Sequence, residues 1–134
     1  MCSIDNIAII DDDEIYQYAS KKIIKSTNRV KNIHVFSNGQ EAIDFFQDNL
    51  NDTTSLPDLI LLDLHMPIID GWQFLEKYRS FKEKIDKKIT IYIITSSMNP
   101  DDLIIARGIS EVTNYLVKPI TLEMFTNILD SIEA

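Results

Sequence analysis

The feature that most constrains the fold is a short apolar run near the middle of the chain. Leu59 to Leu62 are four consecutive apolar residues, preceded by Pro57 and followed at a short distance by Pro67. Such a run between turn residues is typical of a strand that is buried on both faces of a parallel sheet. Asp63 follows the run directly, so we expect its carboxylate at the carboxyl edge of the sheet, where open α/β folds bind their ligands.

Strand and helix patterns alternate along the rest of the chain. Apolar or β-branched segments predict further strands at residues 6–10, 31–36, 89–94 and 115–117. Each predicted strand is followed by apolar residues at helical spacing, and the last helix but one should run from Pro100 to about Ser110. This alternation predicts an α/β fold, a doubly wound five-stranded parallel sheet with helices on both faces.

Length and composition limit the kind of protein. We expect residues 1–134 to form a single domain with no output domain beside it. The chain has no apolar run of about 18 residues, as a membrane span requires, and no secretory signal pattern, so we expect a cytoplasmic protein. A net charge of -8 disfavours direct DNA binding. Cys2 is the only cysteine, which excludes an internal disulfide.

An acidic cluster follows the first predicted strand. Asp13 is suited to cap the next helix, and N-capping alone would explain an acidic residue at that position. Capping does not require Asp11 and Asp12. Adjacent carboxylates are tolerated when they share a cation, and Mg²⁺ prefers oxygen ligands of this kind, so a metal site and simple capping are both open here.

The parallel topology brings residues from distant parts of the chain to one edge of the sheet. These are Asp11, Asp12, Asp63, Thr95 and Lys118, each at the carboxyl end of a predicted strand. Three carboxylates, a hydroxyl and an ammonium suit phosphoryl chemistry, with Asp63 as the nucleophile and a cation held by the acids. Taken singly, Lys118 could serve only as a neutralising ion pair, and Thr95 only as an ordinary strand residue.

These residues and their surroundings resemble the receiver domains of two-component response regulators, over essentially the whole chain. The resemblance rests on the pair Asp11-Asp12, on Leu-Leu-Asp-Leu-His-Met-Pro-Ile-Ile-Asp-Gly around Asp63, on Thr95-Ser96, and on Tyr-Leu-Val-Lys-Pro ending at Pro119. The chain looks like a stand-alone, chemotaxis-type regulator. The resemblance implies the flavodoxin-like strand order 2-1-3-4-5.

The resemblance also implies a phosphorylation-activated signalling switch. Asp63 would accept a phosphoryl group from the phosphohistidine of a sensor histidine kinase or a histidine phosphotransfer protein, and the surface that binds an unknown downstream protein would then change. The chain would not be a classical enzyme, although it would catalyse its own Mg²⁺-dependent phosphorylation and dephosphorylation. The resemblance implies that Asp12, Asp63 and the His65 backbone carbonyl bind Mg²⁺, with Asp11 acting through water. Thr95 and Lys118 would contact the phosphoryl oxygens, and Thr95 and Tyr115 would move in the switch. The peptide bond between Lys118 and Pro119 would be cis.

Several positions depart from the family pattern or lie where it varies. Glu111 stands where receivers usually carry a small residue, and Gly108 inside the preceding helix suggests that this helix is loose or ends early. His65 and Ser97 lie at positions that tune phosphoryl lifetime in the family, and we expect an exposed imidazole at His65. The segment 49–55 is expected to be a mobile surface connection, and residues 79–88 a charged, solvated one.

Three alternatives remain open at this stage. Asp11-Asp12-Asp13-Glu14-Ile15 nearly matches the nucleophile motif of haloacid-dehalogenase-type phosphatases, but Ile15 breaks that motif. A flavodoxin would share the topology, yet its first loop should be rich in hydroxyls and glycine to bind phosphate, which four acids repel. The third alternative is a receiver-like scaffold that binds its partners without being phosphorylated.

Overall fold

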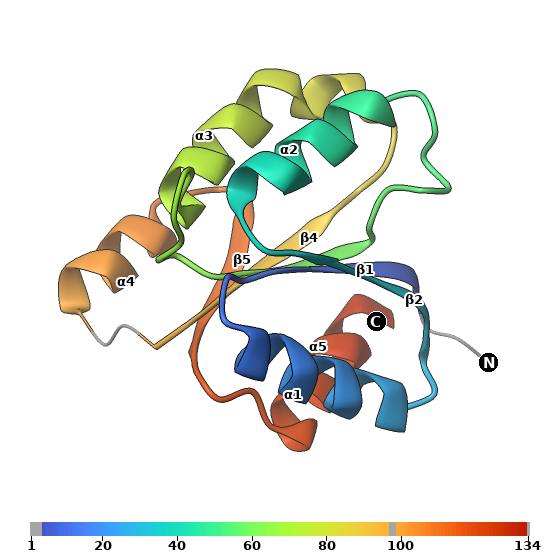
Figure 1. Cartoon of the computed structure of the whole chain (residues 1–134), viewed down its shortest axis with the longest axis vertical. Helices are drawn as coiled ribbons and strands as arrows, with labels where there is room; N and C mark the ends of the chain where they lie inside the picture. Colours follow the sequence, from blue (N-terminus) through green and yellow to red (C-terminus); the bar gives the residue numbers. More distant parts are fainter. Residues whose placement is uncertain (1–3, 97–98, 134) are drawn as a thin grey trace.

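The computed structural model describes residues 4–96 and 99–133, and the predicted alternation of strands and helices is confirmed (Figure 1). The strands are β1 (Ile4–Ile10), β2 (Val30–Phe36), β3 (Leu59–Leu62), β4 (Thr90–Thr95) and β5 (Val112–Val117). The helices are α1 (Glu14–Ser26), α2 (Gly39–Asp48), α3 (Gly71–Phe81), α4 (Pro100–Arg107) and α5 (Leu122–Glu133), and the 3-10 turn η1 (Lys82–Lys84) follows α3.

The five strands form one parallel sheet in the order β2-β1-β3-β4-β5, as expected. In the register, Ile10 is paired with Leu62 of β3, and Leu62 is paired with Ile93 of β4. The central strands therefore end nearly level. The residues that directly follow them are held side by side at the carboxyl edge.

Helices cover both faces of this sheet (Figure 1). One core lies under α2, α3 and α4 and is built around Phe46 and Phe74, whose ring centroids are 6.1 Å apart. The other core lies under α1 and α5 and includes Ile24, Phe125 and Leu129. Leu59 to Leu62 supply side chains to both cores, which confirms that β3 is buried on both faces.

Polar side chains fix the starts of the helices at the carboxyl edge. Asp13 caps α1 by accepting hydrogen bonds from the backbone of Ile15 and Tyr16, and Asp70 forms a capping box with Gln73 at the start of α3. The capping function expected of Asp13 is thus present. It leaves the carboxylates of Asp11 and Asp12 available for a different role.

The structure differs from the sequence prediction in several boundaries. β5 begins at Val112, three residues before the predicted start, because it pairs with β4 from Ile91 onward despite its exposed Thr113 and Asn114. α4 ends at Arg107 rather than near Ser110, and Gly108 is its C-terminal cap. The early end suggested by Gly108 is therefore confirmed.

Two segments, one expected to be mobile and the other to be solvated, make contacts with the rest of the fold. Segment 79–88 is wrongly predicted as solvated, because Phe81 and Ile85 are buried in the core under α2 and α3. In segment 49–55, the Asn6 side chain donates a 2.7 Å hydrogen bond to the Thr54 carbonyl, and Lys87 donates one of 2.8 Å to the Thr53 carbonyl. Within the described ranges, no helix is long and apolar enough to cross a membrane.

Candidate functional site

The carboxyl edge of the sheet brings the predicted site residues together through backbone hydrogen bonds between neighbouring strand ends. The Asp63 amide donates to the Ile10 carbonyl at 2.9 Å, which sets Asp63 beside the end of β1. The Lys118 amide donates to the Thr95 carbonyl at 2.8 Å, which sets Lys118 beside the end of β4. Residues separated by more than half of the chain therefore occupy one site.

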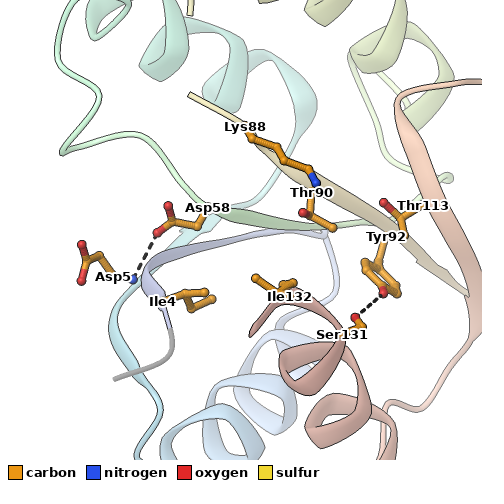
Figure 2. Close-up of a pocket in the computed structure, with 9 residues that line it drawn as sticks. All are labelled: Ile4, Asp5, Asp58, Lys88, Thr90, Tyr92, Thr113, Ser131 and Ile132. Atoms are coloured by element: carbon orange, nitrogen blue, oxygen red, sulfur yellow. Dashed lines mark hydrogen bonds between the residues drawn. The ribbon is translucent and has the colours of Figure 1, made fainter. Parts of the chain in front are cut away.

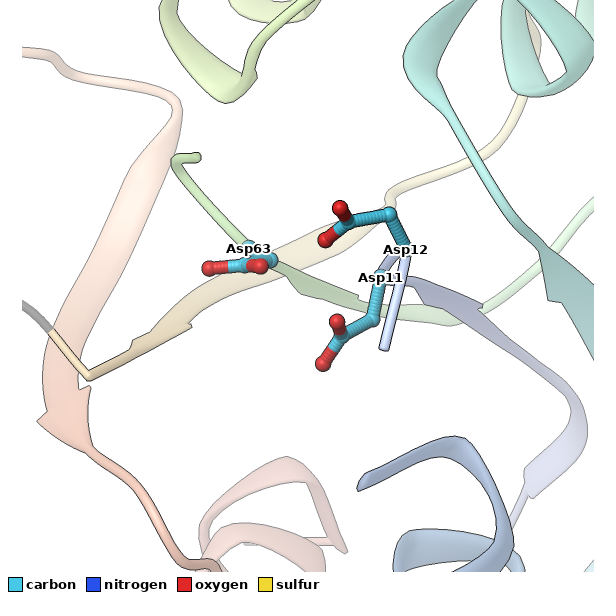
Figure 3. Close-up of side chains that lie close together, drawn as sticks. All are labelled: Asp11, Asp12 and Asp63. Carbon is cyan, nitrogen blue, oxygen red and sulfur yellow. The ribbon is translucent and has the colours of Figure 1, made fainter. Parts of the chain in front are cut away.

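Three carboxylates form the centre of this site (Figure 3). One carboxylate oxygen from each of Asp11, Asp12 and Asp63 lies within 4.8 Å of the other two. Asp11 and Asp63 are buried, whereas Asp12 is exposed. The Asp11 carboxylate is further fixed by the Asp13 amide, which donates a hydrogen bond to it at 2.9 Å.

Lys118 supplies the positive charge in this acidic site. Its side chain is only 4% exposed, and its Nζ lies 2.8 Å from Asp11 Oδ2 and 3.4 Å from Asp63 Oδ2. The neutralising ion pair considered from the sequence is therefore present in this state. The ammonium is also 3.4 Å from Asp63, so pairing with Asp11 does not separate it from the Asp63 carboxylate.

The environment shifts the pKa values of two of these groups. Burial raises the pKa of Asp11, although the hydrogen bond and charge of Lys118 and the hydrogen bond from the Asp13 amide act in the opposite direction. Burial alone would lower the pKa of Lys118, but its hydrogen bonds and charge interactions with Asp11 and Asp63 outweigh burial and raise that pKa. Lys118 therefore stays positively charged at neutral pH.

The donor set fits a hard divalent cation. Carboxylate oxygens are the ligands that Mg²⁺ and similar ions prefer, and Mg²⁺ retains several waters, which the exposed side of Asp12 would admit. A single ammonium also leaves the three carboxylates with excess negative charge. Among the described residues, no other group of three histidine, cysteine or acidic side chains brings its ligand atoms within 4.8 Å of one another.

The other predicted site residues lie at the end of β4, in β5 and directly after β5. Thr95 is fully buried at the end of β4, and Ser96 is exposed beside it. Tyr115 is half-buried and packs against the core under α2, α3 and α4. The peptide bond between Lys118 and Pro119 is cis, as expected.

His65 lies in the loop after β3, and its side chain is exposed, which agrees with the expectation from the sequence. Its Nε2 is 3.8 Å from Asp102 Oδ2, on the first turn of α4. Ser97, the other position related to phosphoryl lifetime, lies outside the described residues.

Two residues of the first turn of α1 belong to the site although the sequence did not single them out. The Tyr16 ring centroid lies 4.3 Å from Lys118 Nζ, and the Gln17 side chain donates a 2.5 Å hydrogen bond to the Asp11 carbonyl. The apolar spacing that predicted this helix contains Ile15, which is 78% exposed. The signal that could have identified Tyr16 is its i, i+4 row with the buried Ser20 and Ile24.

A larger hollow of about 480 Å³ lies at the opposite, amino edge of the sheet, between the starts of the strands and the end of α5 (Figure 2). Its charged lining residues are Asp5, Asp58 and Lys88. Of these, Asp58 already accepts hydrogen bonds from the Asp5 and Asn6 amides and lies 3.0 Å from Lys87 Nζ. The hydroxyls of Tyr92 and Ser131 are hydrogen-bonded to each other at 3.2 Å. The smaller carboxyl-edge site, with its convergent carboxylates, is therefore the better candidate.

Known proteins with similar sequences or structures support this assignment. A two component response regulator from Cytophaga hutchinsonii is 29% identical, and its crystal structure superposes with a TM-score of 0.87 over 96% of both chains. The probable methanogenesis regulatory protein FilR2 of Methanothrix harundinacea is 25% identical over 127 residues, which cover 95% of this chain and 80% of FilR2.

Response regulator Rcp1 of Synechocystis is 26% identical over 129 residues, which cover 96% of this chain and 86% of Rcp1. The crystal structure of its Mn²⁺-bound form, at 24% identity, superposes with a TM-score of 0.73 over 96% of this chain and 89% of the Rcp1 chain.

The family model of the response regulator receiver domain matches residues 7–130, from β1 into α5. This match favours a receiver over the phosphatase and flavodoxin alternatives. It also accounts for an acidic, metal-binding type of site at the carboxyl edge of the sheet. The chain therefore belongs to the response regulator receiver domain family, the phosphorylation-activated switches of two-component signalling.

Proposed function

We propose that Asp63 is the phosphoacceptor of this receiver domain and that Mg²⁺ is its metal. The observation that carries the proposal is the position of the Asp63 carboxylate. It shares a cluster with Asp11 and Asp12, whose oxygens lie within 4.8 Å, and the Lys118 ammonium lies 3.4 Å from it. A cation and an ammonium next to one carboxylate suit the transfer of a charged phosphoryl group to it.

In the proposed reaction, an oxygen of Asp63 attacks the phosphorus of a phosphohistidine. The new O–P bond forms while the N–P bond breaks, and the electron pair of that bond stays on the imidazole nitrogen. Lys118 and Thr95 bind the phosphoryl oxygens and so offset their negative charge. Since Lys118 is held between two buried carboxylates, it is already oriented for this contact before the donor arrives.

Asp12, Asp63 and the backbone carbonyl of His65 would hold Mg²⁺, with Asp11 acting through a water molecule. The bound ion would neutralise charge that develops on the phosphoryl oxygens. Asp11 suits an indirect role because its carboxylate already interacts with Lys118 and with the Asp13 amide. Asp12 suits direct coordination because its side chain is exposed beside the buried pair.

We propose that phosphorylation changes the surface formed by α4, β5 and α5. A hollow of about 220 Å³ lies between α4 and β5, and Tyr115 is one of its lining residues. This space would admit an inward movement of the ring when Thr95 shifts toward the phosphoryl group. Exposed apolar residues that a protein target could cover lie on the same elements, namely Ile104, Ile105, Val117 and Leu122.

The upstream partner in this proposal is a sensor histidine kinase or a histidine phosphotransfer protein, and the downstream partner is a protein rather than DNA. The net charge of -8 supports the second part, because phosphate backbones attract basic surfaces. We further propose that the chain acts in the cytoplasm. It would catalyse its own phosphorylation and dephosphorylation without being a classical enzyme.

Intact-mass spectrometry after incubation with acetyl phosphate and Mg²⁺ tests the phosphoacceptor assignment. We expect one phosphoryl adduct per chain, and we expect its loss in Asp63→Asn and in the absence of Mg²⁺. Asp86→Asn, which removes an exposed carboxylate between η1 and β4, is the matched control and should retain the adduct.

If no adduct forms with several phosphodonors and a fast quench, the phosphoacceptor proposal is wrong. A module that binds partners without phosphorylation would then be the better interpretation. If the adduct persists in Asp63→Asn, another residue is the acceptor. Continuous turnover of small phosphate esters would instead support a phosphatase.

A further inference from the structure

Three side chains lie close to the Lys118 ammonium, and two of them carry charge. The carboxylates of Asp11 and Asp63 lie 2.8 and 3.4 Å from Nζ. The third group is the aromatic ring of Tyr16, whose centroid is 4.3 Å from Nζ. A cation at this distance over a ring face is attracted by the ring quadrupole, most strongly where water is excluded.

Three local features of α1 position the Tyr16 ring beside Lys118. The Asp13 cap starts α1 with hydrogen bonds to the amides of Ile15 and Tyr16, at 2.9 and 3.4 Å. Gln17 ties the same turn to the Asp11 carbonyl. The row of Tyr16, Ser20 and Ile24 faces the sheet, since Ser20 and Ile24 are the buried residues of α1.

The pocket that these groups share with Ser20 and four apolar side chains is small. Its volume is about 10 Å³. A cavity of this size holds at most about one water molecule. The ring therefore borders the space around the ammonium, which pairs with the carboxylates of Asp11 and Asp63.

We propose that Tyr16 is a positioning residue for the phosphoryl transfer, which acts through Lys118. The inference rests on the proposed function of Asp63 and Lys118. The ring face of Tyr16 keeps the Lys118 ammonium desolvated and directed toward the carboxylates. Lys118 can therefore contact a phosphoryl group on Asp63 without first reorienting. The hydroxyl of Tyr16 has no part in this role.

The first test compares two substitutions of the ring. Tyr16→Leu removes the π face but keeps an apolar side chain, and we expect the rate of phosphorylation by acetyl phosphate to fall about 5-fold to 30-fold, the range that cation–π attraction supplies. Tyr16→Phe keeps the face and should recover most of the loss. Tyr18→Leu is the matched control, because Tyr18 lies on the same helix with its ring 5.9 Å from Lys22, outside the site.

The second test asks whether the effect passes through Lys118. In a Lys118→Met background, Tyr16→Leu should lower the rate no further, because the cation it positions is gone. A loss of equal size in both backgrounds, a Tyr16→Leu rate equal to that of the wild type, or an equal loss in Tyr16→Phe would overturn the proposal. Thermal unfolding of each variant separates a change in rate from a change in the folded fraction.

A measurement without phosphodonor distinguishes failure of this inference from failure of the proposed function. The methylene protons of Lys118 next to Nζ should show an upfield ring-current shift in NMR spectra of the wild type and Tyr16→Phe, and lose it in Tyr16→Leu. An ordinary shift in the wild type would refute the ring contact even if Asp63 is phosphorylated. A present ring-current shift without any phosphoryl adduct would instead refute the function of Asp63, and with it the role of Tyr16.

Discussion

Replacing Glu111 with glutamine should destabilise the fold although Glu111 is outside the phosphorylation site. Glu111 directly precedes β5, and its side chain is only 7% exposed. Arg79 Nε donates a 2.6 Å hydrogen bond to the carboxylate, Lys82 donates another, and the Ser110 hydroxyl donates a third at 3.1 Å. The carboxylate thus joins the end of α3 and η1 to the start of β5.

The pKa of Glu111 sets the size of the expected loss in free energy of unfolding. The hydrogen bond from Lys82, followed by those from Arg79 and Ser110, lowers the pKa from 4.5 to about 2, against burial, which raises it. This difference corresponds to about 3.4 kcal/mol at 1.36 kcal/mol per pKa unit, which is an upper limit. Because Arg79 is 49% exposed and Lys82 35% exposed, solvent screening reduces the expected contribution to about 1–2 kcal/mol.

The dependence on pH identifies the charge as the cause. Because the pKa is lower in the folded chain, the stabilisation is fully present above pH 4.5 and is lost as the pH falls toward 2. In urea denaturation at pH 7, Glu111→Gln should therefore lower the free energy of unfolding by about 1–2 kcal/mol. The gap between variant and wild type should narrow progressively below pH 4.5.

Glu83→Gln is the matched control, because Glu83 is an exposed glutamate of the neighbouring η1. Glu83→Gln should change the free energy of unfolding by less than about 0.5 kcal/mol at both pH 7 and pH 3. Equal stability of Glu111→Gln and wild type at pH 7, or a gap that does not change between pH 7 and pH 3, would refute the argument from charge.

Three further substitutions or conditions test other parts of the structure. Gly71→Ala should destabilise the chain by about 1–3 kcal/mol in urea denaturation, because a Cβ would lie 2.6 Å from the Asp63 carbonyl oxygen and 2.8 Å from the Leu64 Cα; wild-type stability would contradict this close approach. Ile68→Asn should stabilise the chain by about 1 kcal/mol, because Ile68 has a φ of 68° and a 74% exposed side chain; a loss of stability would show that the isoleucine makes a contact worth more than its strain. Mg²⁺ at ten times its dissociation constant should raise the free energy of unfolding by about 1.4 kcal/mol over EDTA, and Asp12→Asn should reduce this gain; an equal gain in Asp12→Asn would exclude Asp12 as a ligand.

The sequence predicts the arrangement of the site well because the arrangement depends on topology. Once β1, β3, β4 and β5 are recognised as parallel neighbours, the residues after them must meet at one edge, whatever the details of packing. The proximity of Asp11, Asp12, Asp63 and Lys118 follows from strand ends alone. The resemblance to receiver domains adds the roles, which no spacing rule supplies.

What the sequence does not predict depends on tertiary contacts. The rotation of α1 about its axis decides whether Ile15 or Tyr16 faces the sheet, and the apolar spacing alone favours Ile15. Ile15 is exposed because Gln17 binds the Asp11 carbonyl and because Ser20, a small polar residue, lies on the buried face of α1. A hydrophobic pattern cannot register either interaction, since both involve polar side chains.

Glu111 shows the same limit over a longer range. Read in sequence, it is an unusual charged residue before a strand, and Arg79 and Lys82 lie in a segment that looks solvated. Only the fold brings these residues together, across about 30 positions of the chain, and then the charge that seemed out of place is neutralised by two cations. A departure from a family pattern in one segment can therefore have its explanation in another, and the Arg79 and Lys82 positions should be examined whenever Glu111 is substituted.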